Sequence, residues 1–177
     1  MNAFNSLTEL QLNGTLMTWL EMQTVIASMP NLRLVEMGYN KLATLSSPDD
    51  RLSDNKVLRV INLDSNMLSD WVHVCTSLYR YTSYVLSLEN QIYLFILASR
   101  LERLIFTSNC IGPIVLPEAT RQRLYSLKHI SLSFNNLSAW SDVDALSFWC
   151  PALETLTLGG NPLTGNILEP LRVVDNS

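Results

Sequence analysis

The 177-residue sequence is poor in charged residues, glycine and proline, and these shortages exclude several classes of protein. Charged residues make up 16% of the chain and apolar residues 47%, with 6 glycines and 7 prolines. A disordered or collagen-like chain needs a different balance, so we expect a folded chain with one continuous core. The net charge of −4 argues against a nucleic-acid binder, which needs a basic surface for phosphate contacts. We therefore expect a protein partner and no nucleic acid.

Cysteine and histidine are also scarce, which limits the chemistry that the chain can perform. The cysteines lie 35 and 40 residues apart and form no CxxC pair, so the spacing indicates a reducing compartment and predicts neither a zinc site nor a disulfide framework. No glycine-rich phosphate loop, HExxH or GxSxG motif accompanies the two histidines. His129 and Ser131 share a strand face, but no carboxylate is placed to complete a triad. We predict no enzyme, no cofactor and no metal. The cysteines are Cys75, Cys110 and Cys150.

Long apolar runs are missing as well. The N-terminal residues MNAFNSL lack the cationic stretch and apolar region of a secretory signal. The most apolar run, residues 84–98, carries Glu89, Asn90 and Gln91 in its middle, where hydrocarbon disfavours them. The sequence thus predicts no membrane segment and a cytoplasmic protein.

The sequence does contain one strong internal repeat, the pattern LxxLxLxxNxL, which occurs six times. The distances between successive first leucines are 25, 26, 43, 26 and 26 residues. Repeats of this length and pattern are typical of leucine-rich repeats, in which a short strand alternates with a helix or turn. We therefore predict an α/β fold, a leucine-rich-repeat solenoid or horseshoe with parallel strands on the concave face and short helices on the convex face. The first leucines are Leu7, Leu32, Leu58, Leu101, Leu127 and Leu153.

The whole chain, 1–177, is predicted to be one domain of about six repeats. One step is about 17 residues longer than its neighbours, and the excess lies near 78–98. Two explanations stay open: a real insertion, or a translated intron in the gene model. Neither end carries an obvious capping element, so we also expect the chain to be a fragment of a longer protein. The predicted repeats are 7–31, 32–57, 58–100, 101–126, 127–152 and 153–177.

The repeat positions have different physical roles. Leucines two apart on a strand face the core, and the residues between them face outward. The asparagine in each copy after the first comes where the strand ends, and its side chain is expected to bond backbone groups of the turn. Thr15 takes that place in the first copy and can do only part of the work. Trp19, Trp71 and Trp140 follow the turns at similar spacing and are predicted to pack in the core.

The outward strand positions define a candidate protein-binding surface on the concave face. Acidic residues occur in the first three copies, whereas Arg103 and His129 occur in later ones. Two aromatic residues among these positions, Tyr39 and Phe134, favour a contact surface over an ordinary solvated strand, because aromatic residues and arginine are common anchors. The candidate residues are Glu9, Glu36, Tyr39, Asn62, Asp64, Arg103, His129 and Phe134.

Details between the repeat positions resemble the tubulin-specific chaperone E (tubulin folding cofactor E) family. Residues 10–19, LQLNGTLMTW, resemble a repeat of that family in which threonine replaces asparagine and tryptophan follows. Residues 101–111, LERLIFTSNCI, followed by IVLP at 114–117, resemble its strand and its aliphatic-proline excursion. Residues 132–140, LSFNNLSAW, and the terminal GNPL at 160–163 resemble its last two repeats, so the likeness spans roughly 7–165.

This resemblance implies a non-enzymatic module that takes part in tubulin folding and in assembly or dissociation of the α/β-tubulin heterodimer. The implied partners are α-tubulin and other tubulin-folding cofactors, and the implied location is the cytoplasm and its cytoskeleton. Family members typically add CAP-Gly and ubiquitin-like domains, which this sequence lacks. The alternative is a generic leucine-rich-repeat interaction scaffold, of the phosphatase-regulatory or ribonucleoprotein type.

Overall fold

The computed structural model describes residues 4–45, 57–82, 101–117 and 123–165, with the last residues of one helix, 79–82, described for the backbone only. Their strands form one six-stranded sheet whose order follows the sequence, β1-β2-β3-β4-β5-β6. Every neighbouring pair is parallel, and each strand has three residues. The predicted solenoid of parallel strands is therefore confirmed. The strands are β1 (Glu9–Gln11), β2 (Leu34–Glu36), β3 (Val60–Asn62), β4 (Arg103–Ile105), β5 (His129–Ser131) and β6 (Thr155–Thr157).

The pairing register is the same between all neighbouring repeats. Leu10 lies opposite Val35, and Val35 lies opposite Ile61. Ile61 lies opposite Leu104 in the same way, although the chain step between these strands is the long one of 43 residues. The extra residues therefore leave the register unchanged. Residues 78–82 of the predicted insertion lie in a helix, and residues 83–98 lie outside the described residues.

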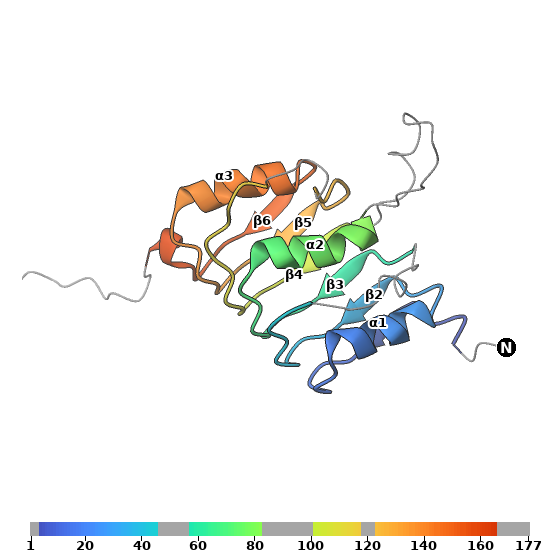
Figure 1. The fold of residues 1–177 in the computed structure, drawn as a ribbon. Coiled ribbons are helices and arrows are strands. Elements are labelled where there is room, and N and C mark those ends of the chain that lie inside the picture. Colours follow the sequence, from blue (N-terminus) through green and yellow to red (C-terminus); the bar gives the residue numbers. More distant parts are fainter. Residues whose placement is uncertain (1–3, 46–56, 83–100, 118–122, 166–177) are drawn as a thin grey trace, which may run out of the picture.

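The helices α1 (Trp19–Ala27), α2 (Trp71–Thr82) and α3 (Trp140–Trp149) lie on one side of the sheet, as Figure 1 shows. They follow β1, β3 and β5, and a 3-10 turn, η2 (Pro162–Thr164), follows β6. Residues 110–117, which follow β4, form no helix. Gly112, Pro113 and Pro117 explain this difference, because glycine and proline both disfavour helix. Within the described residues, the expected convex helices thus occur in three of the repeats.

Local capping defines the starts of α1 and α2. The Thr18 backbone N–H donates to Glu21 Oε2 at 2.7 Å, and the Glu21 N–H donates to Thr18 Oγ1 at 3.3 Å. This reciprocal pair is a capping box, and the hydrogen bonds from the Thr18 backbone and hydroxyl lower the pKa of Glu21. At α2, the His73 N–H donates to Asp70 Oδ1 at 3.0 Å. Short side chains just before each helix therefore satisfy its first N–H groups.

The core runs between the sheet and the helices. Leu63, Phe106 and Leu132 in the middle repeats are 0% exposed, as their positions in the repeat predict. Leu10 and Leu156 point the same way but are only half-buried, because β1 and β6 are the outer strands of the described sheet. Burial is therefore deepest where a repeat has neighbours on both sides.

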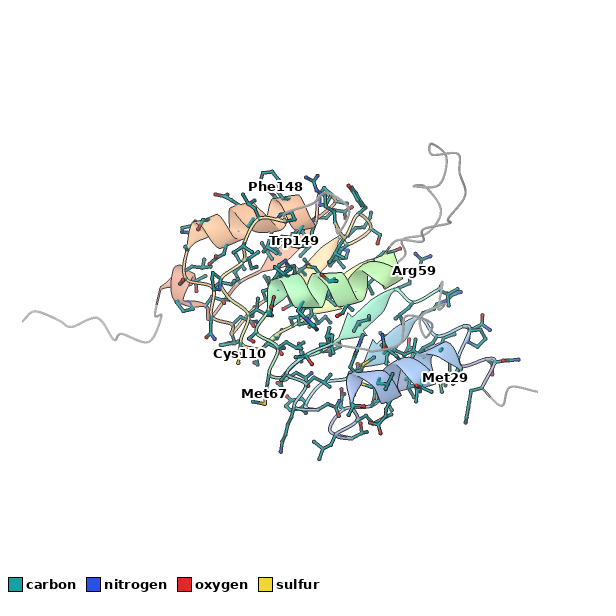
Figure 2. The ribbon with its side chains drawn as sticks, in the orientation of Figure 1. Met29, Arg59, Met67, Cys110, Phe148 and Trp149 are labelled. Carbon is teal, nitrogen blue, oxygen red and sulfur yellow. The ribbon has the colours of Figure 1, made fainter. Side chains whose placement is uncertain are left out.

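The prediction that three tryptophans pack in the core is right for two of them. Trp19 and Trp71 are buried, but Trp140 is 63% exposed. Trp149, at the other end of α3, is buried instead, and Figure 2 shows it turned toward the sheet while Phe148 points away. The reason is the rotation of α3. Asp142 is 3% exposed, and its position on the helix turns Trp140 to the outer face.

Candidate protein-binding face

A ladder of buried asparagines shapes the turns at the ends of the strands. In Asn135, Nδ2 donates to the Phe106 carbonyl at 2.8 Å and the Leu132 carbonyl at 3.1 Å, and Oδ1 accepts from the Ile111 N–H at 2.9 Å. Each asparagine thus bonds its own turn and the turn of the preceding repeat, as expected. Thr15 donates to the Leu12 carbonyl and to Asn40 Oδ1. The equivalent buried residues are Asn40, Asn66, Asn109, Asn135 and Asn161.

The residue before each ladder position has a left-handed backbone conformation in all six repeats. Gly14 and Gly160 take it at φ +66° and +75°, where glycine carries no steric penalty. Tyr39 and Phe134 take it at φ +60° and +56°, and their side chains are 66% and 62% exposed. A bulky residue is unusual in this region. These two aromatic side chains are therefore held out at the rim by a conformation that the turn imposes.

The outward residues of the strands form parallel rows on the sheet face opposite the helices, which we call the concave face. The strand pairings place Glu9, Arg103 and His129 in a first row. Glu36 and Asn62 are adjacent in a second row. Asp64 follows Asn62 by two residues and begins a third row with Thr107, whose N–H it binds. Tyr39 and Phe134 were predicted at outward strand positions, but they lie beyond these rows, in the turns.

Hydrogen bonds between neighbouring repeats hold many of the concave side chains in place. Asn13 Nδ2 donates to Glu36 Oε2 at 2.9 Å, and Asn13 Oδ1 accepts from the Gly38 N–H at 2.7 Å. Asp64 Oδ1 accepts from the Thr107 N–H at 2.9 Å. Such bonds reduce the side-chain freedom that a bound partner would otherwise have to restrict.

A chain of hydroxyl groups continues this ordering toward the last repeat. Thr107 Oγ1 and Ser131 Oγ are 2.9 Å apart, and Thr157 Oγ1 donates to Ser131 Oγ at 2.9 Å. The polar surface of the later repeats is therefore neutral and hydrogen-bonded, with Arg103 at its edge.

The Asp64 carboxylate is half-buried on this face. Burial raises its pKa, the Thr107 hydrogen bonds oppose that rise, and the nearby charge of Glu36 adds to it.

Three apolar residues of the concave face were missed at the sequence level. Leu34 and Val60 are adjacent in the first row, and Ile105 is beside Asn62 in the second. All three are half-buried, and they form the middle of the face. A strand pattern with apolar residues inside and polar residues outside gives no reason to expect them. The strand register applied to the printed sequence would have found them.

Ion pairs lie beside the strands at their N-terminal edge. Arg59 Nη1 and Glu102 Oε1 are 2.8 Å apart, and Lys128 Nζ and Glu154 Oε1 are 2.7 Å apart. The second pair raises the pKa of Lys128 and lowers that of Glu154, chiefly through their hydrogen bond. Both pairs are solvent-exposed, so each adds little to stability.

The described residues hold no group of three or more His, Cys, Asp or Glu side chains arranged to bind a metal. None of their helices has the length and apolar character needed to cross a membrane. The three cysteines are free thiols, with Cys75 and Cys150 buried and Cys110 exposed.

Comparisons with known proteins agree with the repeat pattern. The Leucine Rich Repeat family model matches residues 152–173. Tubulin-specific chaperone E of Homo sapiens is 30% identical over 159 residues, which are 88% of this chain and 26% of that protein. Tubulin-folding cofactor E of Arabidopsis thaliana is 29% identical over 92% of this chain and 28% of its own length. A tubulin-specific chaperone cofactor E-like protein of Rattus norvegicus is 25% identical over 91% of this chain and 33% of its own length.

Among solved structures, an internalin of Listeria monocytogenes matches 78% of this chain and 31% of its own, at 18% identity and a TM-score of 0.43. The chain spans between about a quarter and a third of the length of the curated relatives described above. The chain is thus a leucine-rich-repeat solenoid whose sequence is similar to tubulin-specific chaperone E along most of its length.

Proposed function

We propose that this chain is a tubulin-binding chaperone module that acts in tubulin folding and in assembly or dissociation of the α/β-tubulin heterodimer. The observation that carries the proposal is the 30% identity to human tubulin-specific chaperone E over 88% of the chain. The proposed partners are α-tubulin and other tubulin-folding cofactors, and the proposed location is the cytoplasm, in association with the cytoskeleton. The module works by contact and carries out no catalytic step.

The concave face is the proposed contact surface, through Glu9, Glu36, Tyr39, Asn62, Asp64, Arg103, His129 and Phe134. Its exposed aromatic residues support this choice, because large rigid side chains bury much area at a small cost in entropy. Its polar residues are pre-ordered by bonds such as those of Glu36 to Asn13 and Asp64 to Thr107. A surface that is ordered before binding loses less entropy on contact.

The test is a binding titration of the 177-residue protein with purified α/β-tubulin. Replacement of Arg103 or Phe134 with alanine should weaken binding at least tenfold, since arginine and aromatic anchors commonly contribute about 2 kcal/mol or more. Phe148→Ala is the matched control, because Phe148 is 46% exposed on α3, on the opposite side of the sheet. It should leave the dissociation constant unchanged.

Two results would count against the proposal in different ways. A folded protein with Glu36, Tyr39, Asp64, Arg103 and Phe134 all replaced by alanine that still binds tubulin normally would show that the concave face is not the contact surface. A folded wild-type protein that binds no tubulin would replace the chaperone proposal with the scaffold alternative.

A further inference from the structure

The concave face carries its acidic residues along a diagonal. Glu9 lies in the first row of repeat 1, Glu36 in the second row of repeat 2, and Asp64 in the third row of repeat 3. Neighbouring strands are about 4.8 Å apart and residues i and i+2 about 6.7 Å apart, so neighbouring acids on the diagonal are separated by about 8 Å at Cα. This line crosses half of the described sheet.

An apolar band and then a cation lie on one side of the acidic diagonal. Val60 and Ile105 are half-buried and occupy the first row of repeat 3 and the second row of repeat 4. Arg103, in the first row of repeat 4, is exposed beside them. It lies two strands and two residues from Glu36, which corresponds to about 12 Å between Cα atoms.

The acidic residues are held in orientations that leave them accessible. Glu36 is fixed through one oxygen by Asn13, and Asp64 is fixed by the Thr107 N–H. Gly38 has no side chain that could cover them. A Cβ at this position would lie 3.1 Å from the Asp64 carbonyl oxygen, so a larger residue would be crowded there. Tyr39 is the next residue in the chain, and its side chain is exposed. The Tyr39 backbone N–H donates to the same Asp64 carbonyl at 3.0 Å.

We propose that the concave face binds a partner segment of fixed polarity, with lysine or arginine side chains on Glu9, Glu36 and Asp64, an apolar side chain on Val60 and Ile105, and a carboxylate on Arg103. This inference rests on the proposed function, in which the concave face is the contact surface. Complementary charges at both ends select one direction of the segment, since the reversed direction places like charges together.

The dimensions and chemistry define the segment further. A separation of about 12 Å is spanned by about four residues of extended chain, so a lysine and a glutamate three or four positions apart fit the two charged regions. Tyr39 is exposed in the turn that follows Gly38, where its ring can add a cation–π contact for a bound lysine or arginine. The hydroxyl groups of Thr107 and Ser131 lie on the same side of the acidic diagonal as Arg103 and offer neutral hydrogen bonds.

The first test measures tubulin binding by the intact 177-residue protein with charge-neutral replacements. Glu36→Gln with Asp64→Asn should weaken binding at least tenfold, and this loss should shrink as salt rises from 50 to 500 mM (about 14 Å to about 4 Å of Debye length by the usual scaling). Asp144→Asn is the control, because Asp144 is exposed on α3. Thermal unfolding verifies that each variant is folded. Normal tubulin binding by the double variant would overturn the inference while leaving the proposed function intact.

The second test uses synthetic peptides and does not depend on tubulin. One fluorescein-labelled peptide carries lysine, leucine and glutamate at the proposed spacing, a second has glutamine in place of glutamate, and a third has glutamine in place of lysine. The first should bind at least tenfold more tightly than the other two, and Arg103→Gln should remove its preference over the second peptide. Equal binding of all three would overturn the inference. A clear preference for the first together with no tubulin binding would uphold the charge complementarity and reject the proposed function.

Discussion

Each buried asparagine satisfies backbone groups that belong to two different repeats, which makes it more than a local turn residue. Asn135 bonds the Leu132 carbonyl of its own repeat together with the Phe106 carbonyl and the Ile111 N–H of the preceding one. An isosteric aspartate would keep the acceptor but lose both donations. The repeat therefore requires an amide at this position, and threonine appears only in the first copy, where no preceding strand is described.

Asn135→Ala should lower the free energy of unfolding by about 2–4 kcal/mol, because it leaves several buried backbone groups without partners. The adjacent Asn136→Ala is a close control, since Asn136 is exposed and its side chain donates at the long distance of 3.4 Å to the Cys110 carbonyl. Its effect should stay within about 0.5 kcal/mol. Urea denaturation of both variants measures the difference. A similar small loss for the two would show that the ladder contributes little.

The buried thiols make stability depend on alkaline pH. Burial raises the pKa of the Cys150 thiol to about 12, and it also raises that of Cys75. A thiol in the unfolded chain ionises near pH 8.5, so the unfolded state loses its proton first. The stability is therefore complete below about pH 8.5 and is lost as pH rises toward the folded pKa, by about 1.4 kcal/mol per unit for each thiol.

Between pH 8 and pH 10, Cys150 alone should lower the free energy of unfolding by about 2 kcal/mol. Cys150→Ala should reduce this pH-dependent loss, even though the substitution itself destabilises the core. Denaturant unfolding at several pH values measures both slopes. Equal slopes for the variant and the wild type would mean that Cys150 titrates similarly in both states.

At the scale of elements, Asp142 joins α3 to the loop that replaces a helix in the preceding repeat. Its Oδ2 accepts from the Ser138 and Ala139 N–H groups at 3.2 and 3.1 Å, and its Oδ1 accepts from the Ile114 N–H at 3.1 Å. Trp149 Nε1 donates to the Val115 carbonyl at 2.7 Å. The loop therefore gains from α3 the backbone partners that a helix would have supplied internally.

Asp142→Ala should destabilise the protein by about 2–4 kcal/mol, because one buried and two part-buried N–H groups lose their acceptor. Faster hydrogen exchange at Ile114 should accompany this loss. Asp144→Ala, at an exposed position on the same helix, controls for the change in charge and helix propensity. An unchanged exchange rate at Ile114 would show that the hydrogen bond to Asp142 does not stabilise the loop.

The rotation of α3 also explains where sequence reasoning failed. The recurrence of tryptophan predicts that Trp140 packs like Trp19 and Trp71, and Val143 fits that helical face. The pattern treats Asp142 as a surface residue, but a buried carboxylate with three N–H donors is stable in the interior. Trp140 consequently points outward. Two of the donors, Ser138 and Ala139, are close in sequence. The third, the Ile114 N–H, belongs to a loop that is distant in sequence, so the local pattern does not indicate it.

At the scale of the whole molecule, stability should decrease from the middle strands to the outer ones. Leu104 is fully buried and has a neighbouring strand on both sides, whereas Leu10 and Leu156 are half-buried with one described neighbour. In a solenoid each repeat is stabilised mainly by its neighbours. Hydrogen exchange should be slowest in β3–β5 and faster in β1 and β6. Uniform protection across the six strands would indicate full cooperativity instead.

The parallel sheet, its order and the asparagine ladder could be predicted because they depend on a short pattern that each repeat contains by itself. The concave face could be predicted only in part. Glu36 and Asp64 follow from the strand alternation, but Leu34, Val60 and Ile105 depart from it and depend on the register between repeats. The left-handed backbone at Tyr39 and Phe134 could also have been predicted. Gly14 and Gly160 take the equivalent position in their repeats, and glycine there indicates a turn geometry that the repeats share.

The unchanged register between β3 and β4 has a consequence for how such a chain can vary. Backbone pairing and the asparagine bonds align the two strands, so their register does not depend on the number of residues that connect them. Segments can be gained or lost there without displacing a residue on the opposite side of the sheet. An altered splice site in this interval would therefore produce isoforms that differ in the length of this connection and share the same concave face.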